Sequence, residues 1–218
     1  RGQFKGQGDI LALAEQLHAA QGITSIDSPA GLRLGLRDYQ KEGLAWLQFL
    51  REQKLSGILA DDMGLGKTAQ TLAHLLLEKG GGRLDRPALI VLPTSLIFNW
   101  KHEAARFAPG LKVLSLHGPE RKSRFAEIPG HDVVLTTYPL LWRDADELMQ
   151  HRYHLLILDE AQTVKNAQSQ GAEAVRKVDA RHRLCLTGTP LENHLGELWS
   201  QFDFLLPGFL GASRQFAK

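Results

Sequence analysis

The chain has 218 residues, of which 26 are Lys or Arg and 24 are Asp or Glu, so its formal net charge at pH 7 is only +2. This charge is too small to argue by itself for a nucleic-acid partner, and no apolar run approaches the ~20 residues of a membrane span, so we expect no membrane partner. A single cysteine excludes a disulfide within the chain, and we expect a cytoplasmic protein, associated with the nucleoid if its source is bacterial.

The first expected element is a heterogeneous segment, residues 1–33. We interpret it as a linker or the tail of a preceding region, with one short amphipathic helix over residues 10–20. From Leu36 to Leu50 apolar residues recur at helical spacing. Short apolar runs and helical stretches then alternate. The expected strands are 57–60, 88–92, 113–116, 133–136, 155–158 and 184–187, and the expected helices are 67–79, 95–107, 138–150, 170–178 and 194–205.

The expected strands are almost continuously apolar, which is typical of strands that are covered on both faces. Their alternation with helices indicates an α/β fold with a parallel sheet and helices on both sides, a three-layer sandwich. No repeat or low-complexity tract interrupts the pattern. We therefore expect residues 34–218 to form one α/β domain.

A glycine-rich loop between the first strand and the next helix predicts a phosphate site. The loop comprises Asp61, Asp62, Met63, Gly64, Leu65, Gly66, Lys67 and Thr68. Its glycines let backbone N–H groups turn toward an anion, and the following helix N-terminus adds a partial positive charge. We expect Lys67 to reach the β- and γ-phosphates of ATP, and the Thr68 hydroxyl to bind Mg²⁺. The loop departs from the usual pattern because Asp61 replaces the first glycine.

Two adjacent carboxylates follow the apolar strand at 155–158. We expect Asp159 to hold Mg²⁺, directly or through water, and Glu160 to orient or deprotonate the attacking water. An Asp-Glu pair alone is usually a solvated turn, but ligands bind at the carboxyl ends of strands in open α/β sheets. Lys67, Asp159 and Glu160 are therefore the candidate catalytic residues of an ATP hydrolase.

Several segments resemble the Swi/Snf family of DNA-translocating ATPases, within helicase superfamily two. They are 58–68, which includes the unusual Asp61; the Asp-Glu-Ala-Gln run at 159–162 with 164–166; and 184–193 with 197–199 and 202–208. The resemblance covers residues 34–218 and implies the first RecA-like ATP-binding lobe of a P-loop NTPase motor. The Asp-Glu-Ala-Gln form resembles bacterial members. The family's second lobe is expected in the same polypeptide, outside this chain.

The resemblance implies roles for further residues. Arg37 and Gln40 stand in a segment similar to the adenine-binding motif, and an amide can pair with adenine N6 and N7; without the family, Gln40 would be interpreted as a solvated helix residue. Thr187, Gly188 and Thr189 resemble the motif that couples the phosphate site to DNA. Segments after the strand ends resemble those that track one DNA strand through its phosphates, although each residue could instead be a cap or loop residue. These candidates are Thr94, Ser95, Asn99, His117, Gly118, Thr137, Lys165 and Asn166, while Trp100 is interpreted as core.

The function that the resemblance implies is a double-stranded-DNA-dependent ATPase and translocase that remodels protein–DNA complexes, with ATP and Mg²⁺ as cofactors. Its expected partners are duplex DNA, the second lobe and a DNA-bound protein. Because the second lobe is expected to supply arginine fingers, this chain alone should be nearly inactive. Two alternatives stay open: a strand-separating helicase lobe of the same superfamily, and a non-catalytic nucleotide-binding interaction module. The tail at 202–208 argues against the first, and the intact Lys67, Thr68, Asp159 and Glu160 argue against the second.

Overall fold

The computed structural model describes residues 25–60, 66–188 and 205. In this part of the chain the strands form one parallel sheet in the order β1-β6-β5-β2-β4-β3. The strands are β1 Gly57–Ala60, β2 Ala88–Leu92, β3 Val113–Ser115, β4 Val133–Thr137, β5 Tyr153–Leu158 and β6 Ala180–Thr187. The predicted α/β class with a parallel sheet is confirmed. Only β5 and β6 begin clearly earlier than the apolar pattern indicated.

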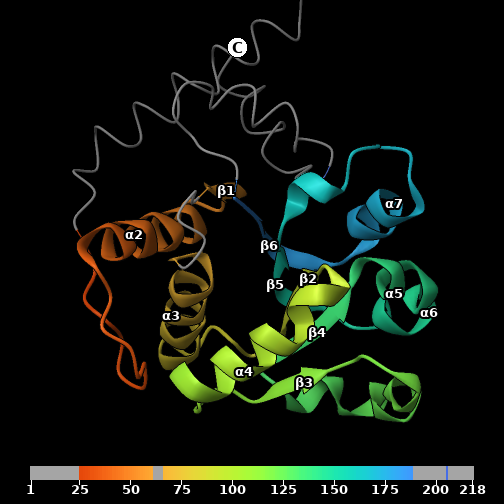
Figure 1. Ribbon diagram of the computed structural model, residues 1–218, viewed down its shortest axis with the longest axis horizontal. Helices are drawn as coiled ribbons and strands as arrows, with labels where there is room; N and C mark the ends of the chain where they lie inside the picture. The colour runs from red at the N-terminus through yellow and green to blue at the C-terminus, as the bar shows by residue number, and fades with distance from the viewer. Residues whose placement is uncertain (1–24, 61–65, 189–204, 206–218) are drawn as a thin grey trace, which may run out of the picture.

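Helices cover both faces of this sheet. One group consists of α2 (Asp38–Glu52), α3 (Gly66–Gly80) and α4 (Ile97–Phe107), and the other of α5 (Tyr138–Arg143), α6 (Ala145–Leu148) and α7 (Gln170–Lys177). Figure 1 shows α2 and α3 on one side of the sheet and α5, α6 and α7 on the other. Three 3-10 segments complete the described elements: η1 (Thr94–Leu96), η2 (Pro119–Gly130) and η3 (Ala161–Thr163).

Alternating residues of each strand build two separate hydrophobic cores. On β2, Ile90 packs in the core under α3 and α4, whereas Leu89 and Val91 pack in the core under α5 and α7. All five residues of β2 are fully buried. Successive strand side chains point to opposite faces, so a strand covered on both sides must be apolar throughout. This explains why the strands could be located as continuous apolar runs.

The helical segments also differ from the expected ones, at 119–130 and at 138–148. The helix expected at 138–150 is divided into α5 and α6 at Asp144, a buried residue whose carboxylate accepts two hydrogen bonds from Arg121, at 2.7 and 3.0 Å. Arg121 belongs to η2, a segment that no hydrophobic periodicity indicated. This partly buried ion pair therefore connects η2, which was not predicted, to the break between α5 and α6.

Some expectations fall on residues outside the described ranges. They are the helix at 10–20, most of the helix at 194–205, and the linker up to residue 24. The described linker residues contact the domain: Arg33 N–H donates to the Phe107 carbonyl at 2.7 Å, and Ile26 N–H to the Lys41 carbonyl at 3.3 Å. The domain boundary at residue 33 stays a prediction.

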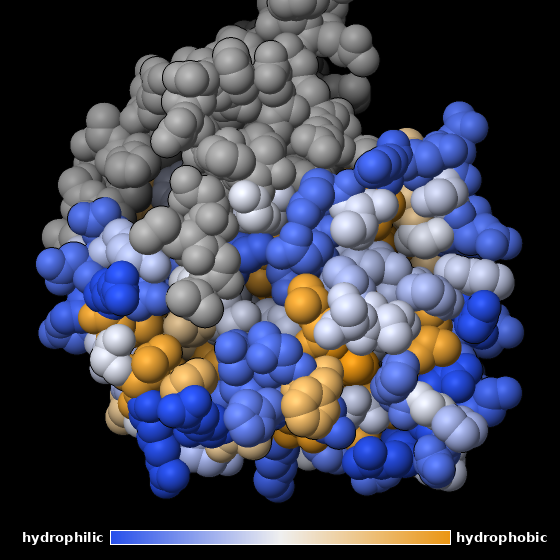
Figure 2. Space-filling model, in the orientation of Figure 1, coloured by the Kyte–Doolittle hydropathy of each residue, from blue (hydrophilic) through white to orange (hydrophobic). Residues whose placement is uncertain are grey.

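The surface of the described part is mostly hydrophilic. Its exposed large apolar side chains are Tyr39, Phe98 and Trp142, and Figure 2 shows apolar groups scattered among hydrophilic ones on the face in view. Among the described helices, none has the length and apolar character needed to cross a bilayer.

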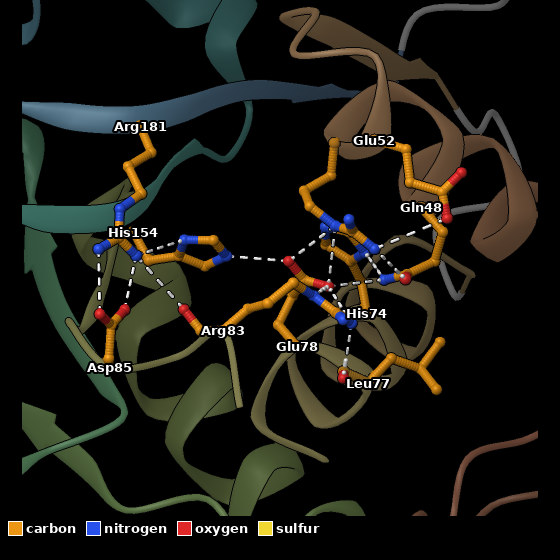
Figure 3. Close-up of polar contacts among 10 residues, drawn as sticks. Gln48, Glu52, His74, Leu77, Glu78, Arg83, Asp85, His154 and Arg181 are labelled. Atoms are coloured by element: carbon orange, nitrogen blue, oxygen red, sulfur yellow. Dashed lines mark hydrogen bonds and ion pairs between the residues drawn. The ribbon is translucent and has the colours of Figure 1, made fainter. Parts of the chain in front are cut away.

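A buried polar network lies at the sheet edge where the strands begin (Figure 3). At its centre is Glu78, near the end of α3, with no solvent exposure. Its carboxylate accepts hydrogen bonds from Gln48 (3.1 Å), Arg51 (3.2 Å), Arg83 (2.9 Å) and, through Nε2, His154 (2.9 Å). Burial alone would raise the pKa of Glu78, but these donors and the neighbouring cations hold it far below its usual value. The network thus joins α2 and α3 to the first residues of β5.

His74, whose Nδ1 lies 2.8 Å from Gln48 Nε2 in this network, makes stability depend on pH. Burial lowers the pKa of His74 from 6.5 to about 4, and the attraction of Glu78 offsets this only in part. Between pH 6.5 and 4 the unfolded chain therefore binds a proton that the folded chain does not. The free energy of unfolding should fall as the pH falls through this range, by up to about 1.4 kcal/mol per pH unit from this residue.

Urea denaturation at pH 7, 6 and 5 and constant ionic strength measures this slope. The slope should become smaller in His74→Gln, although His182, whose pKa burial also lowers to about 4, continues to contribute. An unchanged slope in His74→Gln would show that His74 is not the group responsible.

Candidate nucleotide-binding site

The candidate site lies at the edge of the sheet where the parallel strands end. Register pairs Ala60 with Thr187, Val91 with Leu158, and Leu92 with Thr137, so these strand ends lie side by side. Because β1, β6 and β5 are consecutive in the sheet, the residues that follow them are neighbours. This is the edge at which open α/β sheets bind ligands.

Lys67 and the two carboxylates meet at this edge. Lys67 is in the first turn of α3 and only 6% exposed. Its Nζ lies 2.6 Å from Glu160 Oε1 and 4.0 Å from Asp159 Oδ1. Residues 93 positions apart in the chain are thus brought together, as the sequence predicted.

The two carboxylates have different environments. Burial raises the pKa of Asp159, although hydrogen bonding from Trp100 and the charge of Lys67 oppose it. Burial would also raise the pKa of Glu160, but hydrogen bonds from Lys67 and Gln162 outweigh it, so this pKa is lowered. Glu160 is therefore held as an anion beside Lys67. Asp159 is a buried carboxylate whose Oδ1 lies 4.0 Å from the same lysine.

The backbone at Glu160 is in a strained conformation. Its φ of 47° and ψ of 47° lie in the left-handed region, which residues other than glycine seldom occupy. Its N–H donates to Asp159 Oδ1 at 2.9 Å. Such outliers cluster at functional sites and persist only where the surroundings enforce them.

A chain of two hydrogen bonds that sequence reasoning missed joins Glu160 to β6. The Gln162 side-chain amide donates to Glu160 Oε2, and the Thr187 hydroxyl donates to Gln162 Oε1 at 2.8 Å. Thr187 was predicted as a coupling residue, but Gln162 was not given a role although it ends the Asp-Glu-Ala-Gln run. Gly188 also lies beside the site, since a Cβ added there would be 3.8 Å from Lys67 Nζ.

Of the remaining residues in the predicted phosphate and coupling motifs, some are described by the structure and others are not. Gly66 and Thr68 lie in the first turn of α3 next to Lys67. Met63, Gly64, Leu65 and Thr189 lie outside the described residues, so their roles stay predictions.

The predicted adenine-binding residues line a surface pocket of about 280 Å³. Arg37 and Gln40 contribute from the start of α2, Ala69 from α3, and Glu103 and Phe107 from α4. Gln40 is only 7% exposed, and its Oε1 accepts a hydrogen bond from Arg37 N–H at 2.8 Å. The alternative interpretation of Gln40 as a solvated helix residue is therefore wrong.

The residues predicted to contact DNA follow β2, β3, β4 and β5 along the same sheet edge. Most of their side chains are exposed: Thr94, Ser95, Asn99, His117, Lys165 and Asn166. Gly118 is half-buried and has a φ of 87°. Thr137 differs, because it is 1% exposed and its hydroxyl accepts from Leu140 N–H at 3.4 Å at the start of α5. The side chain of Thr137 therefore serves as a helix cap, one of the alternatives left open, and the DNA contacts of the whole set stay predictions.

The residues present fit a magnesium ion bound together with phosphates. Mg²⁺ usually takes one or two protein ligands and completes its shell with water and phosphate oxygens. Asp159 is a buried carboxylate, and Thr68 lies one residue after Lys67 in α3. Within the described ranges no cluster of three or more His, Cys, Asp or Glu could enclose a metal by itself, so phosphate would have to share in holding the ion.

The fold and this site together define the chain as an α/β lobe with a candidate nucleotide site, in which a lysine at a helix N-terminus lies opposite an acidic pair that follows strand β5. The sequence of residues 39–218 matches the SNF2-related domain family, and the chain belongs to this family. The predicted family and RecA-like fold are thereby confirmed.

The chain is also similar to individual members of that family. YwqA of Bacillus subtilis is 42% identical over an alignment of 219 positions that covers 99% of this chain and 24% of that protein. The TATA-binding protein-associated factor mot1 of Schizosaccharomyces pombe is 40% identical over an alignment of 217 positions that covers 94% of this chain and 11% of that protein. The chain thus spans a quarter or less of the length of these relatives.

Two solved structures of the Sulfolobus solfataricus SWI2/SNF2 ATPase core share the fold. The core in complex with dsDNA matches with a TM-score of 0.76 and 36% identity, over 88% of this chain and 40% of that chain. The second structure of the core matches with a TM-score of 0.71 and 38% identity, over 86% of this chain and 38% of that chain.

Proposed function

We propose that this chain is the first ATP-binding lobe of a double-stranded-DNA-dependent ATPase that translocates on DNA and remodels protein–DNA complexes. The observation that carries the proposal is the meeting of Lys67 with Asp159 and Glu160 at the edge where the strands end. A structural scaffold has no need to bury a lysine between two carboxylates at a helix N-terminus, whereas phosphoryl transfer does.

Each group has a distinct task in this mechanism. Lys67, together with the N-terminal N–H groups of α3, binds the β- and γ-phosphates. Thr68 and Asp159 would hold Mg²⁺, which neutralises phosphate charge when it is bound. Glu160, kept anionic by Lys67 and Gln162, orients the attacking water and accepts its proton. The amide of Gln40 and the pocket around it select adenine.

The strand order supports a link between the nucleotide and DNA. The predicted phosphate, metal and coupling residues follow β1, β6 and β5, and the predicted DNA residues follow β5, β2, β4 and β3. Strand β5 belongs to both sets, because Asp159 and Glu160 directly follow it and Lys165 and Asn166 come after η3. A movement of the exposed 165–166 segment on DNA would therefore act on the loop that holds the catalytic carboxylates.

The proposed partners are duplex DNA, a second RecA-like lobe and a DNA-bound protein. Duplex DNA is supported by the related SWI2/SNF2 core that was solved in complex with dsDNA. A second lobe is supported by this chain covering only 40% and 38% of the two related cores. A protein partner is supported by a relative named as a TATA-binding protein-associated factor. The lobe is proposed to act in the cytoplasm.

ATP hydrolysis by this chain, with and without duplex DNA, tests the proposal. We expect the isolated chain to bind ATP but to turn it over at least ~10³-fold more slowly than a polypeptide that also contains the second lobe, because an arginine finger contributes about that factor. In the longer polypeptide, duplex DNA should stimulate turnover without strand separation.

Three results would contradict parts of this account. DNA-stimulated turnover by the chain alone would show that no second lobe is needed. Strand separation by the longer polypeptide would favour a helicase. ATP binding that is the same in Lys67→Ala would favour a non-catalytic interaction module.

A further inference from the structure

The carboxylate of Asp159 is held by an element that follows another strand. Trp100, in α4, donates its indole N–H to Asp159 Oδ2 at 2.8 Å. Both side chains are buried, with 2% of Trp100 and 4% of Asp159 exposed. The Tyr138 hydroxyl, at the start of α5, donates to the backbone carbonyl of Asp159 at 2.6 Å. Elements that follow β2 and β4 therefore both contact the residue at the end of β5.

The bond from Trp100 decides how the carboxylate is oriented. Asp159 Oδ1 accepts from Glu160 N–H at 2.9 Å and lies 4.0 Å from Lys67 Nζ. Among the described residues, Trp100 is the donor to Oδ2. An indole N–H can only donate, so this contact always presents a hydrogen to the carboxylate. It leaves Oδ1 as the oxygen that faces the phosphate site.

Trp100 also stands directly beside the segment predicted to contact DNA. The exposed residues Thr94 and Ser95 open η1, and Asn99 precedes Trp100 in α4. Because a helix moves as a unit, a shift of its exposed first turn on the DNA backbone also shifts the indole. The indole N–H is hydrogen-bonded to Asp159, the one carboxylate predicted to hold the metal.

We propose that Trp100 is a positioning residue that orients the Asp159 carboxylate and makes its orientation depend on DNA contact at residues 94–99. This inference rests on the proposed function. It assigns a chemical role to a side chain whose spacing in the sequence indicated core packing. Partners that orient a metal ligand typically change metal affinity or activity by about 10–100-fold when they are removed.

The test is Trp100→Phe in the polypeptide that contains both lobes. Phenylalanine keeps an aromatic ring in the core and removes the N–H. We expect DNA-stimulated kcat to fall by about 10-fold or more. The KM for ATP and the affinity for duplex DNA should change by less than about threefold, which is clearly smaller than the expected loss of kcat. Calorimetry of ADP binding at a series of Mg²⁺ concentrations gives a second readout, and the Mg²⁺ concentration required should rise.

Trp142→Phe is the matched control. Trp142 lies on α5, is 39% exposed and stacks against the guanidinium of Arg143. This variant loses the same indole N–H and should keep wild-type DNA stimulation and Mg²⁺ dependence. Equal losses in the two variants would overturn the proposal.

Replacing Trp100 with 3-benzothienylalanine keeps the test decisive if Trp100→Phe does not fold. This residue preserves the bicyclic shape and puts sulfur in place of the N–H, so packing is retained and only the donor is lost. Normal DNA stimulation and Mg²⁺ dependence in a folded variant of either kind would overturn the inference. Wild-type protein that duplex DNA does not stimulate would instead overturn the proposed function.

Discussion

Lys67→Ala should abolish ATP hydrolysis, with a loss of at least about 10²–10³-fold, the effect of removing one preorganised charge-stabilising donor. Lys67 is the cation that contacts both Asp159 and Glu160, and it is almost completely buried. Its removal takes away the positive charge expected to face the β- and γ-phosphates. It also leaves two carboxylates without their shared cation, which opposes the binding of a polyanion.

The measurement is DNA-stimulated ATP turnover in the polypeptide that contains both lobes. Lys79→Ala is the control, because Lys79 lies on the same helix α3, is 41% exposed in its side chain and pairs with Asp132 at 2.7 Å. This exposed pair lies at the other end of α3, so turnover should stay near the wild-type value. Hydrolysis that survives in Lys67→Ala would place the catalytic site elsewhere.

Glu78→Ala should cause the largest loss of stability, about 3–5 kcal/mol of the free energy of unfolding, as expected for removing one partner of a buried ionic network. The carboxylate has no exposure. Its removal leaves Arg51, Arg83 and His154 without this hydrogen-bond acceptor, and their side chains are 16%, 34% and 3% exposed. Arg51 and His154 cannot replace the lost carboxylate with water unless the contact between α2, α3 and β5 opens.

Urea denaturation at pH 7 measures this loss. The control is Glu173→Ala, which removes an exposed carboxylate that pairs with Lys177 at 3.3 Å on α7. Exposed helix pairs of this kind contribute about 0.3–0.5 kcal/mol. A Glu78→Ala effect as small as that of Glu173→Ala would mean that the network is solvated in solution.

Much of the fold could be predicted because hydrophobic burial dominates it. Strand β2 was located to the residue, since its five side chains are buried on both faces. The earlier starts of β5 and β6 were missed, because His154 and Arg181 to Arg183 are polar residues. The side chains of His154, Arg181 and Arg183 satisfy their polar groups through Glu78, Asp85 and backbone carbonyls. No local pattern reveals Glu78 and Asp85 as partners, because they lie 76 and 96 residues away from His154 and Arg181.

The meeting of the candidate catalytic residues could be predicted for a different reason. Lys67, Asp159 and Glu160 each follow an apolar strand, so a parallel sheet must bring them to one edge. The roles of Trp100 and Gln162 could not be predicted in this way. Trp100 has the spacing of a core residue, and its hydrogen bond to Asp159 exists only because α4 packs over the end of β5. The residues proposed to contact DNA stay predictions.

The left-handed backbone conformation of Glu160 lowers thermal stability at a residue that the proposed activity requires. Holding a non-glycine residue there costs roughly 1–3 kcal/mol, and φ is 47° in the residue that is proposed to orient the attacking water. Glycine would relieve that cost and discard the carboxylate. Selection for greater heat resistance would therefore favour glycine at this position, whereas selection for the proposed ATP hydrolysis would favour glutamate. Retaining Glu160 requires compensating stability from the rest of the domain.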